Sequence, residues 1–234
     1  MKNNHKVKVS AIIAAGGSGS RMKKRGGKQL LKLLGKPVVI WTLEAFERAK
    51  SITDVIVVID KSKMKVMKQL IAKFKIRKVT ALVAGGETRA DSVTNGIKAI
   101  DPSTSIIAIH DGARPLINPE LIDAAVREAG IYGAVVVAVK AKDTIKTASA
   151  KGFVDRTLPR SILWQAQTPQ VFKREVLQKA YRNENRHKFT DDASLVEADG
   201  IKVKILTGDY SNLKLTTPED LHFAEAILND KTGS

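Results

Sequence analysis

Short apolar runs that are rich in β-branched residues recur along the first 140 residues, and each is followed by a segment with helical periodicity. The runs that we expect to be strands are Val7–Ala14, Asp54–Ile59, Lys78–Val83, Ser105–Ile109 and Gly133–Val139. The segments that we expect to be helical are Lys36–Lys50, Lys61–Lys73, Thr88–Ile100 and Pro119–Ala129. Regular alternation of this kind predicts an α/β protein with a mainly parallel sheet covered on both faces by helices.

The alternation stops near residue 140. The segment Lys140–Arg160 combines charges, small residues and Gly152, which indicates an extended arm or hairpin. Beyond it, we expect a return to the core at Leu163–Pro169, then further elements: helices at Lys173–Arg182 and Asp191–Ala198, a strand at Val203–Leu206, and a last helix from Thr217. We therefore expect one Rossmann-like three-layer domain over residues 1–234, with a projecting β-arm at about residues 141–161.

The charge balance favours anionic partners. The chain has 40 Lys and Arg against 24 Asp and Glu, a formal net charge of +16. Nucleic acid, a membrane surface or a phosphorylated substrate would each fit this charge, and so would the lysine-rich surface of a heat-adapted protein. The chain has no cysteine, which excludes disulfides and thiolate chemistry. No apolar run approaches the roughly 20 residues that span a bilayer, and Met1–Lys8 is polar, so we expect a cytoplasmic protein.

A glycine-rich loop, Ala14-Ala15-Gly16-Gly17-Ser18-Gly19-Ser20-Arg21-Met22, follows the first expected strand. Glycines let backbone N–H groups approach phosphate oxygens closely, and Arg21 and Lys28 add positive charge. The alternative is a flexible turn with incidental charge. We expect the loop to cradle the phosphates of a nucleoside triphosphate.

Two familiar phosphate motifs are absent from this loop. A dinucleotide fingerprint needs a third glycine where Met22 stands. A Walker loop needs glycine at Met22, five residues before Gly27, and Ser or Thr at Gln29. The loop is also expected to run to about residue 36 before a helix begins, which suits a triphosphate that lies across it.

The segment Gly85-Gly86-Glu87-Thr88-Arg89-Ala90-Asp91-Ser92-Val93 follows the third expected strand. Open α/β sheets bind ligands at the carboxyl ends of their strands, so this segment is a candidate for nucleotide binding. The alternative is that Thr88 only caps an ordinary charged helix. The segment alone does not decide between the two.

The segment His110-Asp111-Gly112-Ala113-Arg114-Pro115 follows the fourth expected strand. Mg²⁺ prefers one or two carboxylates together with phosphate oxygens, so Asp111 is a candidate metal ligand. The alternative is that Asp111 caps a turn and pairs with Arg114. We expect His110 to be a packed structural residue.

Other functional classes have little support. The remaining histidines are scattered, and neither an HExxH nor a GxSxG pattern occurs, so a metalloprotease or serine hydrolase is not indicated. The charge keeps a nucleic-acid-binding domain open, but only 5% of residues are aromatic, no RNA-binding signature is present, and the lysines are dispersed. We therefore expect neither nucleic acid nor a membrane as partner.

The three motifs in this order resemble the GT-A-like nucleotidyltransferases, and most closely the 2-C-methyl-D-erythritol 4-phosphate cytidylyltransferase family of non-mevalonate isoprenoid synthesis. The resemblance covers nearly the whole chain. Later segments that resemble the family are Lys142–Lys146, Arg160–Gln170, Thr190–Ala193 and Asn212–Lys214. The first motif alone is shared by many sugar nucleotidyltransferases, whereas the whole series is specific.

The resemblance implies a nucleotide site. Arg21 and Lys28 would stabilise the charge that develops on the phosphates, and Asp111 would help to hold Mg²⁺ or another divalent cation. The residues that would line CTP are Ala14, Ala15, Gly16, Gly17 and Gly19. Those that would hold cytosine or ribose are Gly86, Glu87 and Ser92.

The resemblance also implies a second substrate, a sugar-alcohol phosphate. Arg160 and Lys214 would position it, and the threonines around it would be Thr144, Thr168 and Thr190. In the family the arm exchanges between two subunits, so Thr144 and Arg160 would serve the partner's site of a homodimer. Asp209, near Lys214, is a weaker second candidate for a metal ligand.

Two residues depart from the family pattern. Glu87 stands where aspartate is expected, and Gly27 stands before Lys28 where proline is common. A sister activity on ribitol 5-phosphate shares the first and third motifs. The segments Ala90–Val93, Lys142–Lys146 and Arg160–Gln170 look more like the isoprenoid enzyme, which is therefore the first hypothesis.

The composition fits the implied chemistry. A phosphate monoester has a second pKa of about 6 and is already anionic at neutral pH, so it needs no serine, cysteine or histidine to activate it. Catalysis would then depend on positioning, a metal ion and positive charge.

Overall fold

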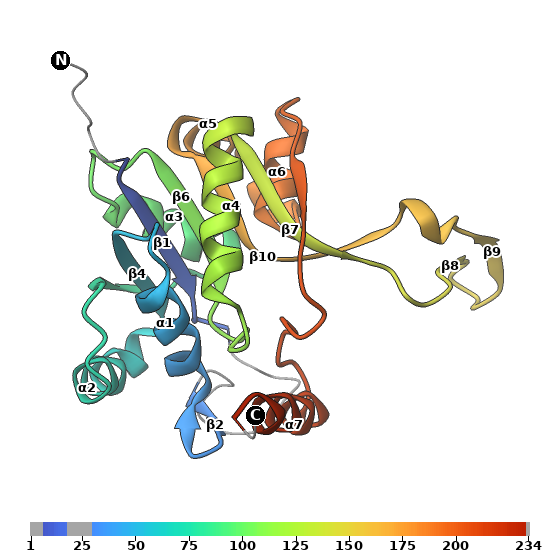
Figure 1. Cartoon of the computed structure of the whole chain (residues 1–234). Helices are drawn as coiled ribbons and strands as arrows, with labels where there is room; N and C mark the ends of the chain where they lie inside the picture. Colours follow the sequence, from blue (N-terminus) through green and yellow to red (C-terminus); the bar gives the residue numbers. More distant parts are fainter. Residues whose placement is uncertain (1–6, 18–29, 233–234) are drawn as a thin grey trace.

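A seven-stranded sheet forms the centre of the computed structural model, which describes residues 7–17 and 30–232 (Figure 1). The strand order is β11-β7-β10-β6-β1-β4-β5. The strands are β1 (Val9–Ala14), β4 (Asp54–Ile59), β5 (Val79–Ala84), β6 (Ile106–Asp111), β7 (Ala134–Lys140), β10 (Trp164–Lys173) and β11 (Lys204–Thr207). The expected mainly parallel sheet is confirmed, since only β10 runs antiparallel to its neighbours β6 and β7.

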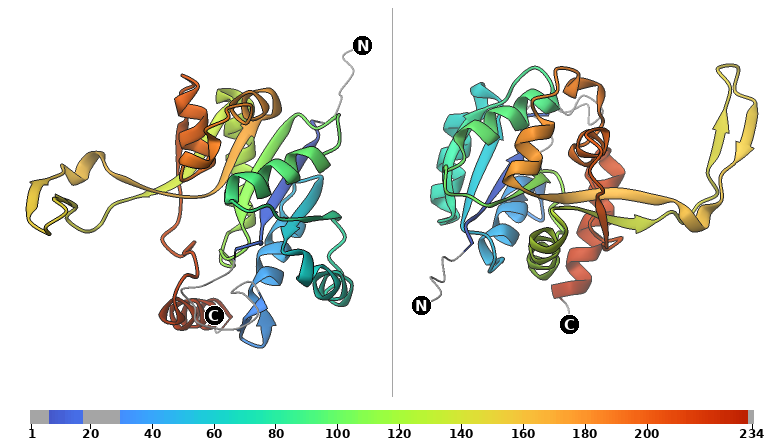
Figure 2. Two further views of the ribbon diagram at one scale, coloured as in Figure 1. Left: turned by 180° about the vertical axis from the view of Figure 1, so that it is seen from behind. Right: turned by 90° about the horizontal axis from the view of Figure 1, so that it is seen from above.

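Helices cover both faces of this sheet (Figure 2). Successive residues of a strand point to opposite faces, so Ile12 and Ile13 of β1 belong to different core clusters. Ile13 packs with Leu43 and Ile122, whereas Ile12 packs with Val93 and Leu177. The helices are α1 (Val38–Arg48), α2 (Met64–Lys73), α3 (Arg89–Ala99), α4 (Pro119–Tyr132), α5 (Arg174–Ala180), α6 (Asp192–Ala198) and α7 (Pro218–Thr232). The expected three-layer α/β architecture is confirmed.

A small hairpin precedes α1, where we had expected helix from Lys36. Its strands are β2 (Lys32–Leu33) and β3 (Lys36–Pro37). Leu34 and Gly35 both have positive φ, 48° and 78°, as a tight two-residue hairpin turn requires. Pro37 is therefore the last strand residue before α1 and not part of the helix. The prediction was wrong here because a proline before a helix fits a strand end as well as a first turn.

A second correction concerns the start of α2. The expected helix from Lys61 opens as a 3-10 turn, η3 (Lys61–Lys63), and becomes α-helical only at Met64. The Asp60 carboxylate accepts a hydrogen bond from the Ser62 backbone N–H and so caps the turn. Another 3-10 turn, η5 (Arg186–Lys188), lies between α5 and α6.

The expected arm projects from the body as a separate two-stranded hairpin (Figures 1 and 2). Its strands are β8 (Lys146–Ala148) and β9 (Val154–Thr157), and the 3-10 turn η4 (Arg160–Ile162) leads back to β10. Phe153, Val154 and Ile162 are exposed large apolar residues of this region. No helix in the described part of the chain is long and apolar enough to cross a bilayer.

Candidate active site

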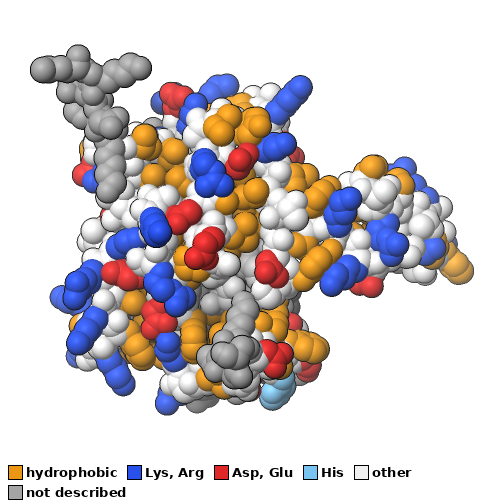
Figure 3. Space-filling model, viewed as in Figure 1, with side chains coloured by type: hydrophobic (Ala, Val, Ile, Leu, Met, Phe, Trp, Pro, Cys, Tyr) orange, Lys and Arg blue, Asp and Glu red, His pale blue; other side chains and the backbone are white. Residues whose placement is uncertain are grey.

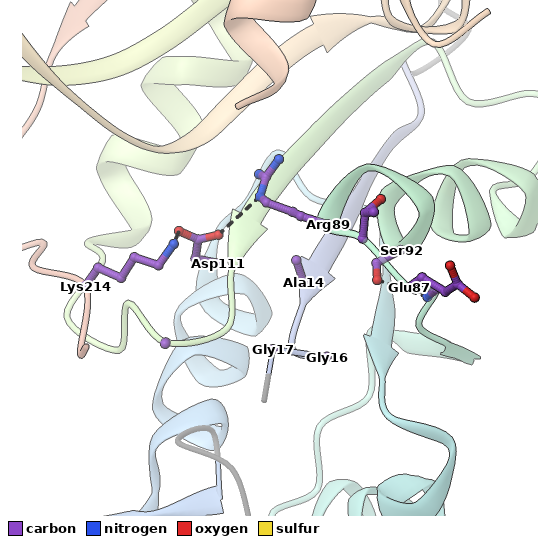
Figure 4. A pocket seen from close by; sticks show the side chains of 11 residues that line it. Ala14, Gly16, Gly17, Glu87, Arg89, Ser92, Asp111 and Lys214 are labelled. Carbon is purple, nitrogen blue, oxygen red and sulfur yellow. Dashed lines mark hydrogen bonds and ion pairs between the residues drawn. The ribbon is translucent and has the colours of Figure 1, made fainter. Parts of the chain in front are cut away.

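A pocket of about 400 Å³ opens where strands β1, β5 and β6 end at their carboxyl termini (Figure 4). This is the edge at which open α/β sheets bind ligands. The residues that line it are Ala14, Gly16, Gly17, Gly86, Glu87, Thr88, Arg89, Ser92, Asp111, Ala113 and Lys214. The three sequence motifs, although far apart in the chain, therefore share one cavity.

The second motif shapes one wall of the pocket. The Gly86 backbone N–H donates a hydrogen bond to Ser92 Oγ at 3.1 Å, which folds the strand end onto the first turn of α3. A Cβ at Gly86 would lie 2.4 Å from the Asp91 Cβ, so only glycine fits. Thr88 caps α3 in a reciprocal capping box with Asp91. The segment is thus both a helix cap and a pocket wall, and the two sequence interpretations do not compete.

Asp111 lies at the centre of the site and is surrounded by cationic side chains. Its carboxylate lies 2.8 Å from Lys214 Nζ, 3.6 Å from Arg114 Nε and 3.9 Å from Arg89 Nε. Burial alone would raise the pKa of Asp111, but the positive charges of Lys214, Arg89 and Arg114 outweigh it and hold the pKa well below the usual range. Asp111 is therefore an anion at neutral pH, and the pairing with Arg114 expected under the alternative interpretation is real.

Arg89 is the residue that sequence reasoning missed. Its guanidinium forms a bidentate ion pair with the buried Asp192 carboxylate, at 3.1 and 2.7 Å. Asp192 in turn accepts a hydrogen bond from the Tyr181 hydroxyl. Arg89 and Asp192 both stood in motifs, but they are 103 residues apart and nothing in either motif paired them.

A hydrogen-bonded chain behind Asp111 fixes its backbone. The Asp111 N–H donates to Thr168 Oγ1 at 3.1 Å, and Thr168 Oγ1 lies 3.1 Å from His110 Nδ1. His110 Nε2 lies 3.3 Å from the Arg114 carbonyl, which can only accept, so the proton of the ring is assigned to Nε2. Burial lowers the pKa of His110 to about 3. His110 is thus a neutral structural residue, as expected.

Thr168 is part of this hydrogen-bonded network. We had expected it beside the sugar phosphate, but it is 4% exposed and its hydroxyl is used within the protein. Thr168 positions the Asp111 backbone and is not among the residues that line the pocket, and its role beside the sugar phosphate stays a prediction. Ala15, which was expected to line CTP, is wholly buried, and its N–H donates to the Val58 carbonyl.

Lys214 enters the pocket on a segment that is fastened to the third motif. The Leu215 N–H donates to the Ala113 carbonyl at 2.9 Å, and Arg114 Nη1 donates to the Asn212 carbonyl at 2.7 Å. Leu215 is itself wholly buried in a cluster with Leu33 and residues of α7. The C-terminal helix therefore anchors the segment that places Lys214 beside Asp111.

Other expected site residues lie elsewhere in the described chain. Thr144 and Arg160 are exposed on the arm, where Arg160 Nη1 donates to the Lys142 carbonyl at 2.6 Å. Thr190 is exposed just before α6 and does not line the pocket. The Asp209 carboxylate accepts the Ser211 N–H, and no group of three His, Asp or Glu side chains that could hold a metal occurs among the described residues.

Three further expected residues, Gly19, Arg21 and Lys28, lie outside the described residues, as does Gly27. Their roles in the phosphate loop stay predictions. Gly16 and Gly17, at the start of the same loop, line the pocket (Figure 4).

Comparison with known proteins decides the family. A model of the family described as 2-C-methyl-D-erythritol 4-phosphate cytidylyltransferase matches residues 9–230. The chain belongs to this family. A cytidylyltransferase of that name from Pelotomaculum thermopropionicum is 46% identical over 229 residues, which cover 97% of this chain and 96% of the relative. One from Geobacillus kaustophilus is 46% identical over 228 residues, which cover 95% and 97%.

A solved structure supports the same assignment. The 4-diphosphocytidyl-2C-methyl-D-erythritol synthase from Anaerococcus prevotii matches with a TM-score of 0.84 at 34% identity, covering 96% of this chain and 97% of the other. The cytidylyltransferase family membership thus extends over both the body and the arm. The sequence resemblance stated above is confirmed.

Proposed function

We propose that this chain is a cytidylyltransferase that transfers CMP from CTP to 2-C-methyl-D-erythritol 4-phosphate. The products are 4-diphosphocytidyl-2-C-methyl-D-erythritol and pyrophosphate. The observation that carries the proposal is the convergence of the three motifs on one cavity, in a chain that matches the family over residues 9–230. The reaction belongs to non-mevalonate isoprenoid synthesis.

The reaction is a displacement at the α-phosphorus of CTP. An oxygen of the sugar phosphate forms the new P–O bond, the bond to the β-phosphate oxygen breaks, and pyrophosphate leaves. No proton has to be removed, because the phosphate monoester is already anionic near neutral pH, its second pKa being about 6. The protein therefore has to bring together two anions and stabilise the charge of the transition state.

Cations of the chain supply this stabilisation in the proposal. Lys214 and Arg89 line the described pocket, and their positive charge attracts the phosphates of both substrates. Arg21 and Lys28 act on the triphosphate from the glycine-rich loop. The wall that would take up the cytidine part of CTP is formed by Gly86, Glu87 and Ser92. Glu87, whose side chain is longer than that of the aspartate expected at this position, is exposed.

Mg²⁺ is proposed as the metal, with Asp111 as its protein ligand. Among the described residues, Asp111 is the carboxylate that lies beside three cations, and Glu87, the other carboxylate of the pocket lining, stands on the wall proposed for cytidine. Phosphate oxygens and water would therefore supply most of the ligands of a bound ion. When bound, the ion neutralises charge on the phosphates. The protein's own part is to keep Asp111 ionised and its backbone fixed through Thr168.

We also propose a homodimer in which the arms exchange. Thr144 and Arg160 lie on an arm that stands away from the body, so within one chain they do not line the pocket (Figure 1). Three exposed apolar residues, Phe153, Val154 and Ile162, would be buried by a partner subunit. Because CTP is a cytoplasmic metabolite, we place the enzyme in the cytoplasm.

A substrate panel tests the proposed reaction. The protein is mixed with CTP, Mg²⁺ and either 2-C-methyl-D-erythritol 4-phosphate or ribitol 5-phosphate, and pyrophosphate release is followed. We expect turnover with the first sugar phosphate and far less with the second. Faster turnover of ribitol 5-phosphate would favour the sister activity, and the absence of release with both would contradict the proposal. Salt-sensitive RNA binding without CTP binding would favour the nucleic-acid alternative.

A further inference from the structure

The strand β5 forms one edge of the seven-stranded sheet. Among the described strands it pairs only with β4, on its inner side. An edge strand presents backbone N–H and C=O groups that can pair with another chain, and proteins usually cover or blunt such an edge. This edge lies on the side of the sheet away from the arm, and the active-site chemistry described above does not use it.

A groove of about 780 Å³ runs between helix α2 and this edge strand. Apolar side chains from both elements line its floor: Met64, Ile71, Ala72, Ile76, Val79, Ala81 and Leu82. Cationic side chains form its rim: Lys65, Lys68, Lys75 and Arg77. A strand added at an open edge points every second side chain to the same face, so those side chains can enter an apolar groove beside the edge.

The charge of the groove has one sign. Residues 61–78 contain eight Lys and Arg and no Asp or Glu. Among the described residues, none of the four rim cations takes part in an ion pair, and all four are exposed. Figure 3 shows Lys and Arg side chains gathered on the face over α2.

The backbone of Lys75, one of the rim cations, lies in the left-handed region. It has a φ of +54°, a conformation that favours glycine at the end of a helix. A lysine at this position keeps a cation on the rim at a small cost in backbone energy.

We propose that this groove binds an acidic, extended segment of another protein, which adds a strand to the edge of β5. Apolar residues of that segment enter the floor between α2 and β5, and the acidic residues that alternate with them meet the rim cations. The cationic rim favours an acidic ligand because opposite charges attract, and the unpaired strand edge favours an extended ligand because its backbone groups can pair with an added strand.

Two other occupants fit less well. A single-stranded nucleic acid would meet the positive rim, but none of the described residues that line the groove is aromatic and could stack its bases. A second copy of this chain, paired β5 to β5, would bring the two cationic rims together, and like charges across an interface oppose association.

The test uses a ten-residue synthetic peptide in which valine and glutamate alternate. Binding to the full-length protein is measured by fluorescence anisotropy, and the peptide's site by backbone amide NMR. We expect binding, with shifts concentrated in residues 79–84. Lys68→Glu with Lys75→Glu should weaken it about tenfold or more, since each reversal replaces an attraction to the glutamates of the peptide with a repulsion. Ala72→Trp, which fills the floor, should weaken it without changing the charge.

The matched control reverses two exposed lysines outside the groove, Lys98→Glu with Lys202→Glu, and should leave peptide affinity near that of the wild type. CTP turnover should be unchanged in all three variants. The proposal is overturned if the peptide does not bind, if a peptide with lysine in place of glutamate binds equally well, or if single-stranded oligo-dT binds more tightly in the same groove. Self-association through residues 79–84 without peptide would also overturn it.

Discussion

Asp111 was a candidate for two roles in the sequence, a structural ion pair and a metal ligand, and its position in the structure is compatible with both. It pairs with Arg114, as a structural role requires, and it also lines the pocket, as a catalytic role requires. The sequence predicted its place because an acid after a buried strand must lie at the sheet's ligand-binding edge. It could not predict Arg89 as a neighbour, because that contact depends on how α3 packs near α6.

Arg21 and Lys28 of the glycine-rich loop are proposed to act on the triphosphate. Lys28→Ala and Arg21→Ala should each lower turnover by about 10²–10³-fold, the loss expected when one group that stabilises transition-state charge is removed. The fold should be unaffected, which circular dichroism and thermal unfolding will check. Near-normal turnover in either variant would mean that the loop has another role.

The buried His110 predicts how stability depends on pH. Its pKa is about 3 in the folded protein and about 6.5 when unfolded, so between these values the unfolded state binds the extra proton. The free energy of unfolding should therefore fall as pH falls from about 6.5 toward 3, with a slope that approaches ~1.4 kcal/mol per pH unit from this one group.

Urea unfolding at a series of pH values measures this slope. The range from pH 6 to 4.5 is the most informative, because carboxylates with ordinary pKa values near 4 titrate mostly below it. His110→Asn should flatten the slope there. An unchanged slope in that variant would show that other groups carry the pH dependence.

Among the helices and strands, the sequence predicted where most elements lie but not which strands pair with each other. The strand Asp54–Ile59 was predicted with its observed bounds, because a run of six buried residues between polar ones leaves few alternatives. The return from the arm at Leu163–Pro169 was expected, but its antiparallel insertion between β6 and β7 was not. Long-range pairing of this kind depends on the whole sheet and leaves no local signal.

Two helical glycines give a matched pair of predictions. A Cβ on Gly96 of α3 would lie 2.8 Å from Ile12 Cγ2 and 3.1 Å from Val58 Cγ2, so Gly96→Ala should push α3 away from the sheet. We expect a loss of roughly 1–3 kcal/mol in unfolding free energy and a higher KM for CTP, because α3 carries Ser92 and Arg89.

The comparison is Gly130→Ala in α4, where the new Cβ would meet only Ile106 Cδ1, at 3.8 Å. Alanine costs less backbone entropy than glycine in a helix, so this variant should gain about 0.5–1 kcal/mol with KM unchanged. Chemical denaturation and initial-rate kinetics measure both. Equal effects at the two positions would mean that the packing of α3 does not set the pocket wall.

In the whole molecule, the described pocket of a single chain is lined by only part of the expected set of substrate-binding residues. Lys214 lies in the pocket, whereas Arg160 lies on the arm. The sequence predicted the arm from the break in alternation but could not give its direction, which depends on where β7 and β10 leave the sheet.

Subunit complementation tests arm exchange directly. Arg160→Ala and Lys214→Ala variants are each expected to be nearly inactive. When the two are unfolded together and refolded, mixed dimers should regain one intact site, formed by Lys214 of one subunit and Arg160 of the other. Random pairing should give about a quarter of the wild-type activity, since half the dimers are mixed and each has one site of two. No recovery would place both residues in the same chain's site.

The proposed reaction joins CMP to the phosphate of the sugar alcohol, and ³¹P NMR of the reaction mixture observes that bond. With CTP, Mg²⁺ and 2-C-methyl-D-erythritol 4-phosphate, the monoester signal should disappear as two coupled diphosphate doublets and pyrophosphate grow in equal amounts. An Asp111→Asn sample should show little change over the same time. A persistent monoester signal, or inorganic phosphate in place of pyrophosphate, would contradict the proposed reaction.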